Sequence, residues 1–359
     1  LHPRVRRQRQ MCIRDRPILE CILIDASTND IKFTSNDMEL GIETRVQGMV
    51  LEKGIIALDA KIFSEIVRKL PDSDVTIETD EKLNTTITCE KAKFNIPGKS
   101  GEDFAYLPLI EKNECIRVSQ FTLKEIIRQT IFSIALNENN KLMTGELFQI
   151  ENNRLRVISL DGHRISIRRV PLKEPCEDRK VIVPGKTLNE ISKILSGEME
   201  DMVDIYLSTN HILFEFDDTT VVSRLIEGEY FKIDQMLSSD YETKVKINKK
   251  EFLDCIDRAT LLVKEGDKKP IIINIEDGQM ELSIDSQIGS MKEDIDIEKE
   301  GKDIMIGFNP KFLIDALKVI DDEEISIYLM NPKAPCFIRD DEQQYIYLIL
   351  PVNFNAAGR

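Results

Sequence analysis

The pattern of apolar positions repeats along the chain at a spacing of 125 residues. Three segments carry apolar residues at i, i+3 and i+7: DAKIFSEIVRKL (59–70), PGKTLNEISKIL (184–195) and NPKFLIDALKVI (309–320). This spacing predicts helices that each bury one face. An alternating stretch typical of a strand follows each helix, at 75–79, 203–207 and 325–329. The chain therefore contains three copies of one fold.

A second helix is predicted ahead of the strands in copies two and three, at 122–135 and 251–264. Copy one has matching strands at 22–37 but no helix before them. Each copy is expected to place two helices against antiparallel sheets, an α+β arrangement, with the first copy lacking its leading helix and strand. The predicted domains span 17–116, 117–243 and 244–359.

Residues 1–16 differ from the rest of the chain. The segment LHPRVRRQRQMCIRDR holds six Arg and one Asp, a net charge of +5, and has no periodicity. A basic arm that binds nucleic acid is one interpretation. We expect a foreign segment instead, because MCIRDR looks like translated cloning sequence and the segment stands where the first copy's leading helix should be.

Composition is typical of a globular protein, with 42% hydrophobic and 31% charged residues among 359. The chain has no run of about 18 uncharged apolar residues and no apolar stretch of the secretory type at its start, so we expect no membrane partner. The seven cysteines include no CxxC pair. This favours reduced thiols in the cytoplasm, and we expect no metal and no other cofactor.

The net charge of −15 at first argues against nucleic acid. The predicted helices nevertheless lean basic, with bases seven residues apart on the face opposite the apolar stripe. A solvated face with local ion pairs is the alternative, but five helices of the same sign favour a surface that follows phosphates without reading bases. The candidate DNA-facing residues are Lys61, Arg68, Lys69, Lys124, Arg128, Lys186, Lys193, Arg258, Lys311 and Lys318.

The segment VISLDGHRISI (157–167) holds the residue types of a hydrolase triad. If it is one strand, Ser159, Asp161 and His163 share a face but point out in parallel, about 6–7 Å apart. A working triad needs nucleophile and base within about 2.6–3.2 Å, and no G-x-S-x-G elbow is present. We therefore expect no catalytic residues and no enzyme.

From residue 17 to about 354 the chain resembles the bacterial DNA sliding clamp family, the β subunit of the replicative DNA polymerase III holoenzyme. The resemblance rests on TGELFQI, SLDGHRISIRR, VVSRLIEGEYF and YIYLILPV, and the triplication agrees with it. It implies a cytoplasmic processivity factor: a head-to-tail homodimeric ring around double-stranded DNA, with helices lining the hole and sheets outside. It also implies docking of the replicative polymerase, the clamp loader and other peptide partners. A repeat scaffold that binds only proteins remains the alternative.

By residue-wise match, the resemblance implies a peptide pocket formed by Met143, Leu160, Gly162, His163, Arg164, Ile165, Phe231, Gln235, Met236, Pro335, Leu348, Leu350, Pro351 and Val352. An apolar cleft at a domain junction with a few polar groups is typical of peptide sites. Phe231 stands where the family usually has Pro, Gln235 where a basic residue is common, and the end reads LPVN rather than LPVR. The dimer contact matches Leu261 and Leu262, against an edge of the first domain.

Overall fold

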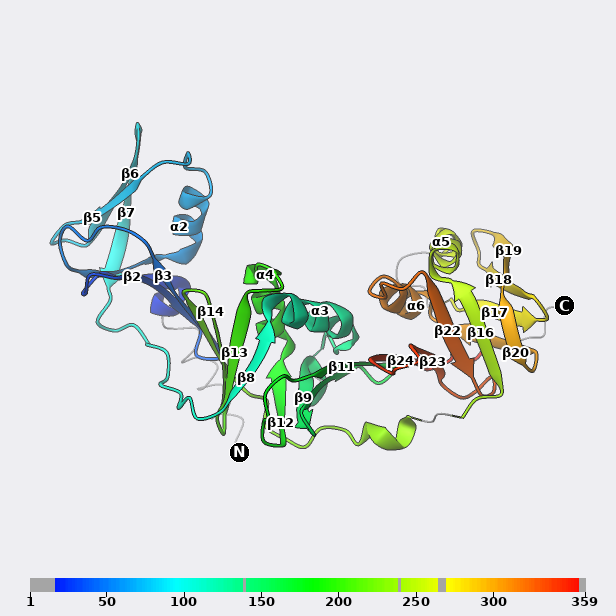
Figure 1. Ribbon diagram of the computed structural model, residues 1–359. Coiled ribbons are helices and arrows are strands. Elements are labelled where there is room, and N and C mark those ends of the chain that lie inside the picture. The colour runs from blue at the N-terminus through cyan, green and yellow to red at the C-terminus, as the bar shows by residue number, and fades with distance from the viewer. Residues whose placement is uncertain (1–16, 138–139, 238–239, 264–268, 355–359) are drawn as a thin grey trace, which may run out of the picture. The chain divides into compact units, whose positions relative to one another are not determined.

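The computed structural model describes residues 17–137, 140–237, 240–263 and 269–354 (Figure 1). The segment 1–16, expected to be foreign, lies outside the described residues. The chain divides into two compact units. The first holds residues up to Cys115 together with Asp201–Arg224, and the second holds Ile116–Glu200 together with the chain from Leu225 onward.

The first unit has one α-helix among its described residues, α2 (Ala60–Val67), after the short 3-10 helix η1 (Pro17–Glu20). Its strands are β1 (Cys21–Asp25), β2 (Ile31–Asn36), β3 (Leu40–Val46), β4 (Ile55–Asp59), β5 (Val75–Thr79), β6 (Asn84–Cys89), β7 (Ala92–Ser100), β13 (Met202–Leu207), β14 (His211–Phe216) and β15 (Thr219–Arg224).

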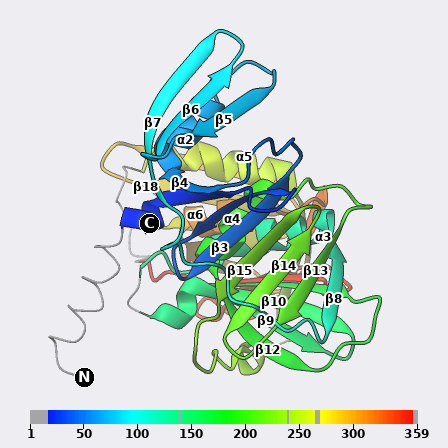
Figure 2. The same cartoon turned by 90° about the vertical axis from the view of Figure 1, so that its left-hand side faces the viewer.

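These strands pair antiparallel in the order β5-β6-β7-β4-β1-β2-β3-β15-β14-β13. Figure 2 shows β3, β15, β14 and β13 side by side. At the β3–β15 pairing, Ile42 lies opposite Val221. Strands from the first and second sequence copies therefore share one sheet.

The second unit contains four longer helices: α3 (Gln120–Thr130), α4 (Gly185–Ile194), α5 (Lys249–Thr260) and α6 (Pro310–Leu317). Its short 3-10 helices are η2 (Ile131–Ser133), η3 (Lys141–Thr144) and η4 (Ile233–Met236). Strand β8 (Cys115–Ser119) leads into α3.

The remaining strands of this unit form two sheets. The nine-stranded sheet has the order β12-β9-β10-β11-β24-β23-β22-β16-β20 and the four-stranded sheet the order β19-β18-β17-β21. The strands are β9 (Gly145–Glu151), β10 (Arg154–Leu160), β11 (Arg164–Pro171), β12 (Arg179–Pro184), β16 (Thr243–Asn248), β17 (Ile271–Glu276), β18 (Gln279–Asp285), β19 (Ser290–Asp296), β20 (Glu298–Gly301), β21 (Ile304–Phe308), β22 (Glu324–Leu329), β23 (Cys336–Arg339) and β24 (Tyr345–Ile349).

The predicted helices are confirmed, with ends that differ by a few residues. Helix α2 begins after Asp59, whose side chain accepts a hydrogen bond from the Ile62 backbone, and α6 begins after Asn309, which caps Lys311 in the same way. The helix predicted over 122–135 ends at Thr130 and continues as η2. The α+β three-copy class is confirmed.

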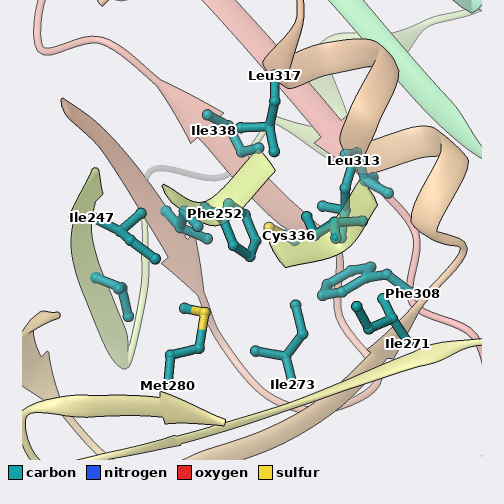
Figure 3. Packing of buried hydrophobic residues seen from close by; sticks show 14 of the residues in the cluster. Ile247, Phe252, Ile271, Ile273, Met280, Phe308, Leu313, Leu317, Cys336 and Ile338 are labelled. Atoms are coloured by element: carbon teal, nitrogen blue, oxygen red, sulfur yellow. The ribbon is translucent and has the colours of Figure 1, made fainter. Parts of the chain in front are cut away.

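The largest core cluster fills the third repeat. Phe252 of α5 and Leu313 and Leu317 of α6 pack with residues of both sheets, among them Ile273, Met280 and Cys336 (Figure 3). A second cluster, hereafter the hairpin cluster, lies on one face of β9, β10, β11 and β24 and includes Leu147, Ile158, Leu160, Ile165, Ile167, Tyr230, Ile233 and Leu348. This cluster carries the residues from which the candidate site is built.

Within the described residues, no helix is long and apolar enough to cross a membrane. None of the cysteines in this part of the chain forms a disulfide. Over the same residues, no group of three or more metal-ligating side chains comes together.

Candidate peptide-binding site

The conspicuous motif of the sequence forms a tight hairpin. Strands β10 and β11 are joined by Asp161, Gly162 and His163, and Gly162 has φ +89°, a left-handed conformation that glycine adopts without strain. The Asp161 carboxylate accepts hydrogen bonds from the backbone N–H groups of His163 (3.0 Å) and Arg164 (3.2 Å). The side chain of Asp161 therefore fixes the turn.

The three triad-type residues do not converge on one another. Ser159 is buried and donates its Oγ hydrogen to the Thr130 carbonyl, 2.5 Å away. His163 is exposed, and its ring stacks on Phe312 at 5.9 Å between centroids. The premise that 159–163 is one strand is wrong, because β10 ends at Leu160. The conclusion that these residues form no triad stands, for a different geometric reason.

Arg164 lies beneath the turn rather than on its surface. Its guanidinium donates to the carboxylates of Asp161 (3.0 Å) and Asp315 (2.6 Å) and to the Phe132 carbonyl (2.6 Å). The Phe312 ring lies 4.6 Å from its central carbon. Each of the three guanidinium nitrogens donates to one of these partners, so Arg164 positions the hairpin against α6.

Most of the apolar residues predicted for the pocket meet at the hairpin cluster. Leu160, Ile165 and Leu348 are buried within it, and Met143 and Leu350 pack against it from partly exposed positions. The β11–β24 register sets Ile165 opposite Leu348. The Leu350 backbone N–H then donates to the His163 carbonyl at 2.9 Å. Residues nearly 200 positions apart in the chain thus share one surface.

The segment 231–236 supplies the exposed part of this surface. Phe231 is 36% exposed and meets the Tyr230 ring edge-on, and Met236 is 46% exposed. Gln235 is also exposed. Tyr230 and Ile233, which are buried in the hairpin cluster, hold this segment in place. Two apolar side chains are therefore presented to solvent beside a preformed core.

Pro335, Pro351 and Val352 are partly buried at the ends of β23 and β24. The Val352 backbone N–H donates to the Gly307 carbonyl of β21 at 2.8 Å, which ties the chain after β24 to the four-stranded sheet. The surface formed by the fourteen residues predicted from the resemblance is hereafter the peptide surface.

Sequence reasoning missed one ionisable group next to this surface. Glu146 of β9 is fully buried, and loss of hydration raises the pKa of its carboxyl to about 8, with Thr130 acting in the opposite direction. Burial and the nearby Glu146 also raise the pKa of the Tyr230 phenol. Nothing in the segment TGELFQI separates a buried Glu from an exposed one, since apolar and polar residues flank it alike.

The ten candidate DNA-facing residues divide into two groups. The first group is exposed and lies on or just after α2, α4 and α6: Lys61, Arg68, Lys69, Lys186, Lys193, Lys311 and Lys318. The second group lies on α3 and α5 and has close partners. Lys124 donates to the Leu195 carbonyl, Arg128 pairs with Glu125 and Asp321, and Arg258 pairs with Glu293. The repeated helix exposes its bases in all three copies, although Lys193 also pairs with Glu190, and Arg258 of α5 is exposed as well.

The two candidate dimer residues follow the end of α5. Leu261 is 79% exposed, whereas Leu262 is partly buried and packs against the core of the third repeat. Leu261 is therefore the one of the two that is open to solvent.

The fold has three copies of one α+β unit, basic helices and a partly exposed apolar surface, and its most conspicuous motif forms no triad. These features define a clamp-type binding protein. Three domain families match the chain: DNA polymerase III beta subunit N-terminal domain (residues 8–108), central domain (117–232) and C-terminal domain (234–353). The chain belongs to the DNA polymerase III beta subunit family. The first match begins inside the segment 1–16, whose foreign origin stays a prediction.

Individual relatives agree with this membership. The beta sliding clamp of Staphylococcus epidermidis is 34% identical over 347 residues, covering 94% of this chain and 92% of that protein. A crystal structure from Eubacterium rectale, assigned to the same subunit, is 73% identical with a TM-score of 0.92 and covers 95% of this chain and 93% of that one. The Bacillus subtilis DNA polymerase sliding clamp is 34% identical with a TM-score of 0.90, at the same coverage. The family is one of non-catalytic processivity factors, so the chain is not an enzyme.

Proposed function

We propose that this protein encircles double-stranded DNA as a head-to-tail homodimer in the bacterial cytoplasm and tethers the replicative polymerase, the clamp loader and other peptide partners. In this proposal, residues 17–116, 117–243 and 244–359 are its three clamp domains. The observation that carries it is the repeated helix, which exposes lysines in the same register in all three copies (61, 186 and 311). Identical spacing supports a common target with a repeating negative charge, which is what a duplex backbone offers.

The peptide surface is the proposed tether. Phe231, Met236 and Leu350 offer apolar anchors, and the hairpin turn and Gln235 offer polar groups at the rim. Few anchors beside a rigid core suit a short peptide, because little ordering of the protein is needed on binding. Leu261 is the proposed centre of the contact between subunits.

The DNA part of the proposal is tested by retention on circular DNA. After loading onto a nicked circle by a bacterial clamp loader, the protein should co-elute with the circle and be released when the circle is linearised. Reversing the charge of Lys61, Lys186 and Lys311 to Glu should shorten its residence several-fold at low salt, with a smaller difference at high salt.

The matched control reverses three exposed strand lysines, one per repeat: Lys93, Lys180 and Lys292. Light scattering on each variant checks that the subunits remain associated. Equal residence of the two triple variants at low salt would show that the repeated helices do not face DNA. No retention on circles at any salt concentration would favour the repeat scaffold that binds only proteins, and equal retention on linear DNA would show binding that does not depend on encirclement.

The tethering part is tested with a carboxyl-terminal peptide of a bacterial replicative polymerase. Met236→Ala combined with Leu350→Ala removes two anchors and should weaken peptide binding about 10- to 100-fold by fluorescence anisotropy. The control variant, Met199→Ala with Leu109→Ala, removes the same residue types from other exposed positions. Unchanged affinity in the Met236/Leu350 variant would show that the peptide docks elsewhere.

A further inference from the structure

A cavity of about 490 Å³ lies on the nine-stranded sheet, lined by Gln149, Glu151, Asn152, Arg154, Arg156 and Arg169. The β9–β10–β11 register sets Arg156 opposite both Gln149 and Arg169, so these three side chains form one row across the sheet. Arg154 lies two residues before Arg156, on the same face of β10. The lining therefore carries three guanidinium groups and a single carboxylate, that of Glu151.

One arginine of this cavity, hereafter the arginine cavity, has unused hydrogen-bonding capacity. The Arg156 Nη1 atom lies 2.8 Å from Asp234 Oδ1, but its Nε and Nη2 atoms are buried and have no acceptor among the described residues. Arg169 donates from Nη1 to the Gln343 carbonyl at 2.8 Å. Glu151 accepts from Gln149 at 2.7 Å. Buried guanidinium nitrogens that lack a hydrogen-bond acceptor favour the binding of an anion whose oxygens can accept those hydrogen bonds.

The charges in the cavity repel one another. Burial and the positive charges of Arg156 and Arg154 lower the pKa of Arg169, while Asp234 and Asp340 act in the opposite direction. These two carboxylates offset the repulsion between the guanidinium groups only in part, so a further negative group would stabilise them. The whole chain has a net charge of −15, so a site with an excess of positive charge stands out from its surroundings.

The arginine cavity adjoins the hairpin cluster, against which the peptide surface is built. The next row on the same sheet face is Leu147, Ile158 and Ile167, which belong to the hairpin cluster. The link is also direct, because Asp234, the acid that reaches Arg156, belongs to η4 together with Met236. A polypeptide that docks at Met236 therefore has the arginines within reach of its flanking residues.

We propose that the arginine cavity binds carboxylate side chains of an acidic segment that flanks the partner peptide, giving the peptide surface a second, charge-reading subsite. The proposal rests on the tethering function proposed above. Acidic side chains would enter between Arg154, Arg156 and Arg169 and supply acceptors to the buried nitrogens of Arg156. Apolar anchoring and charge reading would then be separate contributions, the first insensitive to salt and the second sensitive to it.

The test uses fluorescein-labelled hexaglutamate and hexaglutamine, with the full chain, at low ionic strength and with excess duplex DNA present to cover the basic helices. Hexaglutamate should bind at least tenfold more tightly than hexaglutamine by fluorescence anisotropy. Arg156→Gln combined with Arg169→Gln should reduce hexaglutamate binding at least tenfold. The control, Lys246→Gln with Lys292→Gln, removes two surface lysines that pair with Glu324 and Glu281 and should leave binding unchanged.

A second variant covers the case in which the double substitution unfolds the sheet. Arg154→Gln changes an exposed residue and should weaken hexaglutamate binding several-fold with an unchanged unfolding midpoint. Binding of hexaglutamate that does not depend on these arginines would overturn the proposal. Arginine-dependent binding of inorganic phosphate without binding of hexaglutamate would also overturn it, since the site would then serve small ions.

The result is separable from the tethering function. If the polymerase peptide binds through Met236 and Leu350 while hexaglutamate does not bind, the subsite alone is refuted. If hexaglutamate binds through the arginines while the polymerase peptide does not bind, the cavity remains an acidic-peptide site and the tethering function fails.

Discussion

The first and third repeats carry the same helix pattern but bury it to different extents. Val67 of α2 and Leu317 of α6 occupy the same position in the repeat, 250 residues apart, yet Val67 is 43% exposed and Leu317 is 0% exposed. Ile320 is likewise buried, whereas its counterpart Leu70 is partly exposed. In the third repeat α5 lies against α6, and in the described part of the first repeat α2 is the one α-helix. An apolar stripe shows which face can be buried, and a neighbouring helix decides whether it is.

The acidic position of the repeated helix has diverged as well. Glu65 is exposed, Glu190 pairs with Lys193 at 2.9 Å, and Asp315 binds the buried Arg164 beneath the hairpin turn. One sequence position thus serves as a solvent-facing charge, a surface ion pair and a structural support for the peptide surface. Only the third use connects the helix to the candidate site.

The largest expected difference in stability is between substitutions at Leu317 and at Val67. Leu317→Ala should lower the free energy of unfolding by about 3 kcal/mol, because it opens a cavity in a closed core, whereas Val67→Ala should cost less than about 1 kcal/mol. Urea unfolding followed by circular dichroism measures both. Equal costs would show that residues outside the described part of the first repeat cover Val67.

A smaller effect is expected at the acidic position. Asp315→Asn leaves Arg164 with a weaker acceptor, and because the pair is mostly buried the loss should be about 2 kcal/mol. Glu65→Gln, on an exposed surface, should change stability by less than about 0.5 kcal/mol. The same two variants, titrated with the polymerase peptide, should show weaker binding for Asp315→Asn alone. Equal loss of peptide binding in both variants would show that the effect does not act through the hairpin.

The last effect is gradual rather than abrupt: it compares equivalent strands, β9 and β17, and concerns pH. Glu146 occupies the repeat position of Ile271, and both are fully buried. The folded-state pKa of Glu146, about 8, lies above its ordinary 4.5, so between these values the folded state holds a proton that the unfolded state has released. Its contribution is therefore complete below pH 4.5 and is lost as pH rises toward 8, by about 1 kcal/mol per unit.

Glu146→Gln should remove this slope. The measurement is the urea midpoint of the wild type and of Glu146→Gln at pH 5, 6, 7 and 8. The two curves should diverge with rising pH, the variant becoming the more stable. Ile271→Val, a conservative change at the equivalent core position, should keep the wild-type slope. Parallel curves for the wild type and Glu146→Gln would show that the carboxyl is ionised in the folded protein.

The three-copy organisation can be read from the amino-acid sequence alone, since periodicity and spacing depend only on local order in the chain. The sequence predicted the five main helices to within a few residues at most ends and the strand pairs that follow them, because amphipathic patterns mark their own buried face. The resemblance supplied the residues of the peptide surface, several of which the structure places in or against one cluster. The triad interpretation could be set aside from the sequence, although the expected geometry assumed a continuous strand through Gly162.

Where these faces and charges meet depends on long-range packing. The sheet that joins β3 to β15 and the pairing of β11 with β24 link residues separated by more than 170 positions, which no local pattern encodes. The same is true of the buried Glu146, of Arg164 enclosed by Asp161 and Asp315, and of the row formed by Gln149, Arg156 and Arg169. Charge and hydrophobicity are properties of single residues, but desolvation and pairing depend on neighbours that long-range packing brings together.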